Sequence, residues 1–218
     1  MTTEQTACQK CGNCCKQGGP ALHGQDLARI KSGKIPVSSL ITIRKGELAS
    51  NPLTGKIQPV AVELVKITGT GRQWACCCYD AESGCTVYAD RPYACRLLKC
   101  WDTREILAVV EKYTLSRFDI LEKGDPLVAV IKDHERICPC DDLGFVQSNS
   151  GLLSEEQKNE LEKRVRADLR FRNRAIADFQ LNVRAELFYF GRPLFQLLQQ
   201  VGARIFETPA GIHLGWDK

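Results

Sequence analysis

Two cysteine-rich stretches dominate this sequence. Residues 7–20 read ACQKCGNCCKQGGP, and residues 75–100 read ACCCYDAESGCTVYADRPYACRLLKC. The chain has 218 residues and twelve cysteines, against one Met and three His. Packing alone does not account for so many cysteines. They form disulfides or bind metal, and the cellular compartment decides between these two roles.

The start of the chain favours reduced thiols. Residues 1–6 read MTTEQT, which lacks the basic start and the apolar run of a secretory signal. No apolar run approaches the roughly 20 residues that a membrane span needs. We therefore expect a cytoplasmic protein without a membrane partner, whose thiols bind metal or undergo redox chemistry.

The net charge of the chain does not by itself identify a class of partner. The net charge is +4 with His neutral, which neither requires nor excludes nucleic acid. Basic residues between 163 and 174 are interleaved with acidic ones, and this pattern favours a solvated helix face. The expected partner is therefore a protein or a small molecule rather than nucleic acid, and the sequence does not identify it.

The first stretch has the spacing C-x-x-C-x-x-C-C, formed by Cys8, Cys11, Cys14 and Cys15. A C-x-x-C turn brings two sulfurs within reach of one metal ion. The first three cysteines match the start of the bacterial ferredoxin run C-x2-C-x2-C-x3-C-P, but residue 18 is Gly where that run has its fourth Cys. Adjacent side chains diverge, so Cys14 and Cys15 more readily serve different metals or different edges of one polynuclear cluster.

The second stretch distributes its cysteines over a predicted strand, a turn and a helix. Cys78 closes the strand, and Cys85 follows a Ser-Gly turn. Cys95 lies within a helix that begins near Pro92, and Cys100 ends it.

Four further cysteines keep an open role: Cys76, Cys77, Cys138 and Cys140. On a strand, residues 76 and 78 share a face, so one or two members of the 76–78 triplet can be core residues rather than ligands. The segment 138–140 reads CPC, which adds ligands, forms a redox pair or takes no part in metal binding.

Together the two stretches resemble the zinc- or iron-chelating cysteine-cluster family, whose pattern is CxxCxxCC followed by C-x6-C-T-V-Y-x-x-R-P-x-x-C-R-x3-C. The matching residues are Cys8, Cys11, Cys14, Cys15, Cys78, Cys85, Tyr88, Arg91, Pro92, Cys95, Arg96 and Cys100. The resemblance covers roughly the first half of the chain and implies that the eight matching cysteines ligate metal. One branch of the family, the flagellin lysine methylases, is associated with an iron–sulfur cluster and with methyl transfer from S-adenosylmethionine.

Eight cysteines permit two four-cysteine zinc sites, one [4Fe–4S] cluster with spare thiols, or a larger assembly. The ferredoxin-like opening, the surplus of thiols and the methylase relatives favour an iron–sulfur cluster, most simply [4Fe–4S], with zinc as the alternative. Eight thiolates would move the formal charge from +4 to −4. We expect Arg91 and Arg96, which flank Cys95, to offset the charge of the cluster.

Three functions fit these features. The expected one is an iron–sulfur protein with a redox or cluster-dependent modifying role. The alternatives are a zinc-stapled interaction module without catalytic activity and an S-adenosylmethionine-dependent protein methyltransferase of the flagellin lysine methylase type. The sequence identifies no catalytic residue.

The fold class predicted is α+β, with a small antiparallel sheet, surrounding helices and a helical C-terminal part. Residues 1–140 are expected to form the cysteine-cluster domain, residues 141–151 a linker, and residues 152–218 a helical region packed on that domain. Strands are expected over 40–44, 61–68 and 72–79, with a hairpin turn at 69–71. Helices are expected over 25–31, from Asp90 as N-cap, from a capping box at 102–105, over 125–137, from a capping box at Ser154 to about residue 190, and over 193–201.

Overall fold

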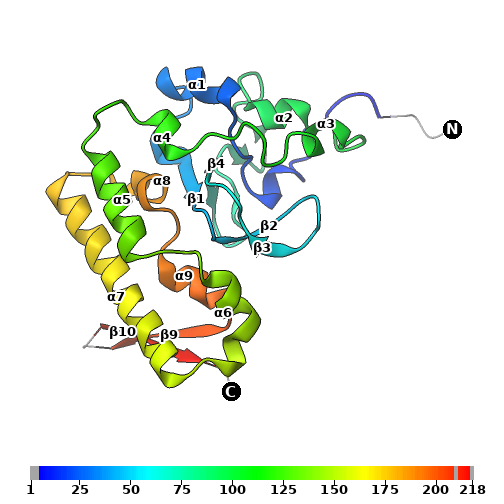
Figure 1. Cartoon of the computed structure of the whole chain (residues 1–218). Helices are drawn as coiled ribbons and strands as arrows, with labels where there is room; N and C mark the ends of the chain where they lie inside the picture. The colour runs from blue at the N-terminus through cyan, green and yellow to red at the C-terminus, as the bar shows by residue number, and fades with distance from the viewer. Residues whose placement is uncertain (1–4, 209–210, 217–218) are drawn as a thin grey trace.

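The computed structural model describes residues 5–208 and 211–216, and it has the predicted α+β architecture (Figure 1). Small two-stranded antiparallel sheets are surrounded by helices. None of the helices in these described ranges is both long and apolar enough to cross a membrane.

The central pair of strands is β1 (Leu40–Ile43) and β4 (Leu64–Ile67), which run antiparallel. All four residues of β1 are buried, as expected for a β-branched and aliphatic strand covered on both faces. Helix α8 (Glu186–Phe190) packs on β1, and Thr42 Oγ1 donates a hydrogen bond to the Phe188 carbonyl at 2.5 Å. A segment near the end of the chain therefore covers the first sheet. A second pair, β2 (Leu48–Ser50) and β3 (Ile57–Pro59), adjoins it.

The cysteine-rich stretch forms two short hairpins rather than one strand. The first pairs β5 (Gly69–Thr70) with β6 (Ala75–Cys76), and the second pairs β7 (Tyr79–Asp80) with β8 (Gly84–Cys85). The strand expected over 72–79 is wrong, because residues 71–74 form the hairpin turn and residues 77–78 form another turn. Cys78 therefore lies in a turn and does not close a strand.

Short helices surround these hairpins. They are the 3-10 helices η1 (Cys15–Gln17), η2 (Gly24–Asp26) and η3 (Val37–Ser39), and the α-helices α1 (Leu27–Lys31), α2 (Tyr93–Leu97), α3 (Arg104–Leu107), α4 (Arg117–Ile120) and α5 (Leu127–Ile137). The helices expected over 25–31 and 125–137 are confirmed within a few residues. The expected N-cap at Asp90 is wrong, because α2 begins later, with Pro92 at its N-cap. The capping box at 102–105 does not form, because Asp102 instead binds the Arg104 guanidinium at 2.8 Å.

The C-terminal part is built on the long helix α7 (Glu155–Asp178). Its N-cap Ser154 and Gln157 form the predicted capping box. The helix ends at Asp178 rather than near residue 190, since Gln180 adopts a left-handed backbone conformation with φ of +49°. The chain then continues through η5 (Val183–Ala185), α8 and α9 (Leu194–Gln199).

Two elements of the C-terminal part differ from the sequence prediction. Residues 141–151, expected to be a linker, contain α6 (Leu143–Asn149) and η4 (Ser150–Leu152), with Leu143 buried. The last described residues form a hairpin of β9 (Ala203–Thr208) and β10 (Gly211–Trp216) that packs against α7 and α9.

The two parts share their cores. Phe188, from α8, lies in the same buried cluster as Leu22, Leu40 and Val65 from the first part. Leu48, from β2, lies in the buried cluster that joins α6, α7 and α9. The C-terminal part therefore packs closely on the first and helps to position its strands.

Candidate metal centre

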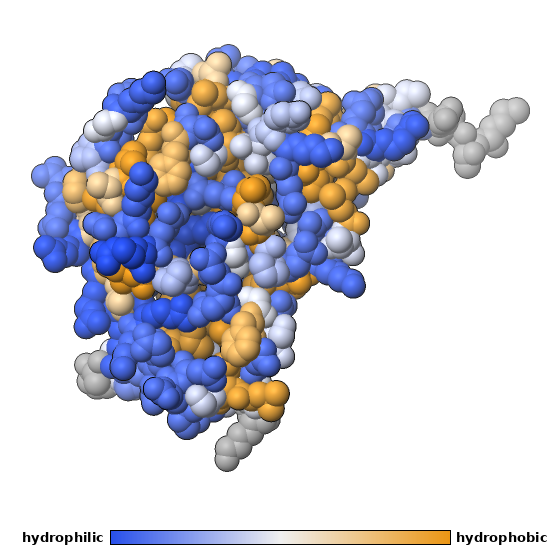
Figure 2. Space-filling view, in the orientation of Figure 1, coloured by the Kyte–Doolittle hydropathy of each residue, from blue (hydrophilic) through white to orange (hydrophobic). Residues whose placement is uncertain are grey.

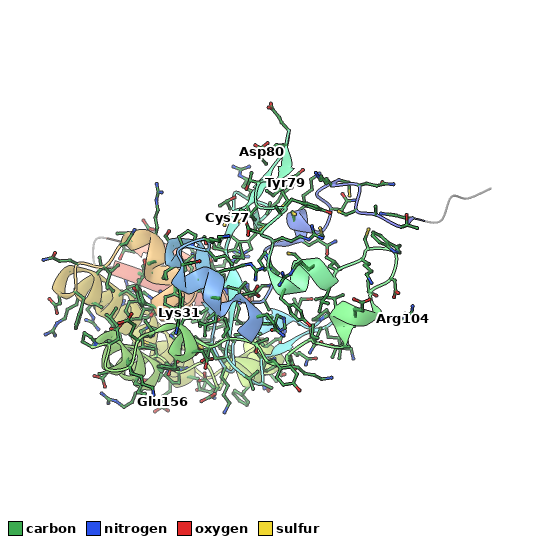
Figure 3. The ribbon with its side chains drawn as sticks, turned by 90° about the horizontal axis from the view of Figure 1, so that it is seen from above. Lys31, Cys77, Tyr79, Asp80, Arg104 and Glu156 are labelled. Atoms are coloured by element: carbon green, nitrogen blue, oxygen red, sulfur yellow. The ribbon has the colours of Figure 1, made fainter. Side chains whose placement is uncertain are left out.

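The first cysteine stretch folds back onto the two hairpins. η1 contacts β6, which brings the loop that carries Cys14 and Cys15 to the strand that carries Cys76. Gly12 lies against the ring of Tyr79, which Figure 3 shows beside the N-terminal loop. A Cβ at Gly19 would lie 2.2 Å from the Ile67 carbonyl oxygen, so only glycine permits this approach to β4. Glycines thus let the loop reach the hairpins.

Six cysteines from three segments converge where the loop meets the hairpins. We call them the inner group: Cys14, Cys15, Cys76, Cys78, Cys85 and Cys95. Burial, reinforced by neighbouring thiols of this group, raises the pKa of Cys15 to about 12. Burial and the same neighbours, Cys76 foremost, raise the pKa of Cys95 on α2. Each of these thiols therefore raises the cost of ionising its neighbours.

The hairpins connect Cys78 to Cys85 through the backbone. Tyr79 in β7 pairs with Cys85 in β8. The Thr86 amide and hydroxyl both donate to the Cys78 carbonyl, at 2.9 and 3.0 Å. These bonds hold both ends of the C-x6-C segment together, which is the geometry that a shared metal centre needs.

The remaining three predicted ligands are Cys8, Cys11 and Cys100, which we call the outer group and which are exposed, as is Cys14 of the inner group. The Lys10 amide donates to Cys8 Sγ at 3.4 Å, and Gln5 Nε2 donates to Cys100 Sγ at 3.5 Å. Figure 2 shows hydrophobic side chains at the surface beside the N-terminal segment, at the end of the molecule that carries α2 and α3.

The structure therefore divides the eight predicted ligands between the two groups. Five belong to the inner group and three to the outer group. It also adds Cys76, which the family pattern leaves out. Strand periodicity places residues 76 and 78 on one face, but it does not show which members of the triplet are ligands, since that depends on how the hairpins fold.

Cationic side chains surround this site by stacking on aromatic rings. Lys10 Nζ lies 4.7 Å and Arg91 Cζ lies 4.0 Å from the centre of the Tyr88 ring. Lys16 lies over Tyr79, with Nζ 5.8 Å from the ring centre. Tyr88 and Tyr79 thus hold cations that the two cysteine-rich stretches carry, and their effect on the thiolates stays a prediction.

Arg96, the second arginine expected to offset the charge, stacks less closely. Its Cζ lies 5.9 Å from the centre of the Tyr93 ring. Both arginines are thus placed near the cysteines by neighbouring tyrosines, and their action on a bound cluster stays a prediction.

The donor chemistry of the site suits a soft metal. All twelve cysteines lie among the described residues, and none is in a disulfide. Thiolates are the ligands that zinc and iron–sulfur clusters take in proteins, and nearby cations and backbone donors stabilise them. The inner group, with the cations around it, therefore fits a metal centre.

The spacing of the thiols is wider than that of a single ion's ligands. In the described part of the chain, the one set of three metal-ligating side chains with donor atoms all within 4.8 Å of one another is His134, Cys138 and Asp168. No three thiols of residues 8–100 lie that close together. The sulfurs of the inner group are therefore spaced more widely than the ligands of a single metal ion.

The set of His134, Cys138 and Asp168 is better explained as a structural ion pair. Asp168 Oδ1 accepts from His134 Nε2 at 2.6 Å and from Arg172 Nε at 2.7 Å, and its Oδ2 accepts from the Leu194 amide at 2.7 Å. The carboxylate is therefore already satisfied.

Two guanidinium groups also oppose a metal cation at this position. Arg172 binds Asp168 directly, and Arg44 Nη1 donates to the Cys138 carbonyl at 2.8 Å. Burial lowers the pKa of His134 to about 4, so the imidazole is neutral at pH 7. A neutral His and a carboxylate between two buried cations hold the helices α5 and α7 together.

The CPC segment lies in this interior rather than at the cysteine site. Cys138 and Cys140 are both buried, and burial raises the pKa of each to about 12. Such thiols stay protonated and inaccessible, so a reactive redox pair is not supported here.

Comparison with known proteins gives one match. Residues 7–113 match the family model CxxCxxCC, whose description is "Putative zinc- or iron-chelating domain". Searches of the curated proteins and of the solved structures found no significant match. The comparisons do not show the relationship to the flagellin lysine methylases. The match spans both cysteine stretches and every residue of the inner and outer groups, so residues 7–113 are similar to this family of zinc- or iron-chelating domains.

Proposed function

We propose that this protein binds an iron–sulfur cluster through thiolates of the inner group and acts in redox chemistry. The observation that carries the proposal is the spacing of these sulfurs. Six cysteines converge on one place, yet no three of their thiols approach one another within 4.8 Å.

A closed zinc site demands a tighter arrangement. With Zn–S bonds of about 2.3 Å in a tetrahedron, every pair of sulfurs must lie about 3.8 Å apart. Three or four thiols of the inner group would have to move together to reach that geometry. In a [4Fe–4S] cluster each thiolate binds a different iron, so the cysteine sulfurs lie farther apart around the cluster. The open arrangement supports the cluster.

Two further features support a redox role. Cys8, Cys11 and Cys14 reproduce the opening of a ferredoxin run, and all three are exposed. A cluster at this edge of the molecule would lie near solvent, where electrons can pass to and from a partner. A reducing compartment such as the cytoplasm would keep the ligands as free thiols.

Anaerobic purification from iron-replete cells, followed by analysis of iron, acid-labile sulfide and zinc, tests this proposal. We expect brown protein with iron and sulfide in similar amounts, visible absorbance, and bleaching with dithionite. Exposure to air should also bleach it, because the outer edge of the site is open to solvent. Colourless protein with zinc and no sulfide would contradict the proposal and favour a zinc-stapled interaction module.

A further inference from the structure

We infer that Cys76 is a ligand of this metal centre, a role that the family pattern does not assign to it. The inference rests on the proposal that the inner group binds metal, and it adds a member to the ligand set. It does not depend on whether the metal is iron or zinc.

The position of Cys76 is fixed by the first hairpin. Cys76 ends β6 and pairs with Gly69 in β5. A Cβ on Gly69 would lie 2.4 Å from the Trp74 carbonyl oxygen, so the absence of a side chain lets the hairpin close tightly. The next amide, that of Cys77, donates to the Thr68 carbonyl at 3.0 Å. The backbone on both sides of the Cys76 side chain is therefore held by hydrogen bonds.

In this position Cys76 lies next to the loop that carries Cys15. β6 contacts η1, which begins at Cys15. Cys76 is 7% exposed, and Cys15, Cys77 and Cys78 pack against the same buried cluster, so burial alone does not distinguish Cys76. The thiols of Cys15 and Cys95 each have Cys76 as a close neighbour. Cys76 thus interacts with cysteines of the loop, the second hairpin and α2.

Cys77 differs although it is the next residue. Its Sγ lies 4.0 Å from the Ser39 carbonyl oxygen, at the end of η3, and 4.0 Å from Cys78 Sγ. The thiols of Cys15 and Cys95 do not have Cys77 among the neighbours that affect them. Cys77 therefore provides a control that matches Cys76 in residue type and differs in direction.

A purely structural role for Cys76 makes a different prediction from a ligand role. A buried thiol that only fills space can be replaced by Ala or Ser with a change in stability alone. A ligand cannot, because neither a methyl group nor a neutral hydroxyl replaces a soft thiolate on iron or zinc. Metal content per folded molecule separates the two roles.

The experiment compares Cys76→Ser, Cys76→Ala and Cys77→Ser in the full chain with the wild type, all prepared anaerobically. Iron, sulfide and zinc are measured per folded monomer, and folding is checked by circular dichroism. We expect both Cys76 variants to lose about half or more of the metal, while Cys77→Ser keeps the wild-type amount. Cys76→Ala fits the apolar site, so it keeps the test valid if Cys76→Ser does not fold.

Full metal content in a folded Cys76 variant would overturn the inference and leave the proposed function intact. Equal loss in Cys76→Ser and Cys77→Ser would also overturn it, because the effect would then not depend on the direction of the side chain. Zinc without sulfide in the wild type would contradict the iron–sulfur proposal alone. Loss of that zinc in the Cys76 variants would still support Cys76 as a ligand.

Discussion

Gly12 lies against the face of the Tyr79 side chain, so that a Cβ on Gly12 would stand 2.2 Å from Tyr79 Cε2. Gly12 also has φ of +75°, a conformation that favours glycine. This contact joins the C-x-x-C loop to the strand that leads from Cys78 to Cys85. The arrangement of the candidate metal centre therefore includes a close contact made by a residue that carries no ligand atom.

We expect Gly12→Ala to lower the metal content and the stability together, because the added methyl group must push the loop away from Tyr79. Metal analysis and thermal unfolding check this. Gly55→Ala is the matched control: Gly55 has φ of +67° but nothing within 4 Å of its added Cβ. It should cost only the backbone strain, about 1 kcal/mol, and keep the metal. Equal metal content in the two variants would show that the contact with Tyr79 does not position the loop.

The buried cluster around Asp168 predicts a loss of stability without a loss of metal. Asp168→Ala removes the buried carboxylate that His134 and Arg172 share and leaves Arg172 with Glu186 alone, which should lower the free energy of unfolding by about 3–5 kcal/mol. Asp178→Ala is the control on the same helix, since Asp178 pairs with Arg174 at the exposed surface at 3.2 Å. It should cost less than about 1 kcal/mol. Loss of metal in folded Asp168→Ala would show that His134, Cys138 and Asp168 bind an ion after all.

His134 gives the stability a dependence on pH. Burial lowers its pKa to about 4 from the ordinary 6.5, so the unfolded state binds more protons than the folded state between these values. Stability should therefore fall as the pH falls from about 6.5 toward 4, with at most about 3 kcal/mol from this residue. Urea denaturation at pH 7 and pH 5, compared with His134→Gln, measures the effect. Gln can still donate to Asp168 but does not titrate. Any loss of metal at low pH lowers the stability of both proteins alike, so the difference between them isolates the contribution of His134. An equal pH dependence in both proteins would contradict the assignment.

Replacement by Ser should affect the interior cysteines, Cys138 and Cys140, differently from Cys95 of the inner group. Cys138→Ser and Cys140→Ser replace a buried thiol by a hydroxyl that must be desolvated, which should cost about 1–3 kcal/mol and leave the metal content unchanged. Cys95→Ser should lower both, because metal binding by thiolates is coupled to folding. Urea denaturation and metal analysis of the three variants check this. Equal loss of metal in all three would show that the CPC segment completes the site.

Sequence patterns predicted helix boundaries well where the boundary depends on residues within one or two turns. The capping box at Ser154 and the period of about 3.6 residues predicted the start of α7, because a capping box and an amphipathic face act within one or two turns. The same period continues through Val183 and Leu187 to Phe190, and this misled the prediction of the end of α7. Those apolar residues belong to η5 and α8, and Phe188 on α8 packs under β1 rather than along α7.

The C-terminal hairpin had a signal that the prediction missed. Ile212, Leu214 and Trp216 alternate with other residues at the period of a strand, and all three pack on the buried cluster of α7 and α9. The segment 141–151 was misjudged for the opposite reason. Its Gly and Ser residues are typical of a linker, but Leu143 and Val146 are buried against the rest of the chain, and tertiary packing outweighs that composition.

The sequence by itself determined the expected chemistry of this protein: cysteine spacing and residue type predict soft-metal ligation by the two cysteine-rich stretches, because a C-x-x-C turn and thiolate chemistry are local properties. Only the tertiary structure decided which thiols meet. Residues 76, 77 and 78 are chemically identical, and the closure of the hairpin turns Cys76 toward Cys15 and Cys77 toward the Ser39 carbonyl. It also decided that Cys138 and Cys140 lie in the interior. These outcomes depend on contacts between segments tens of residues apart, whose energies no local pattern encodes.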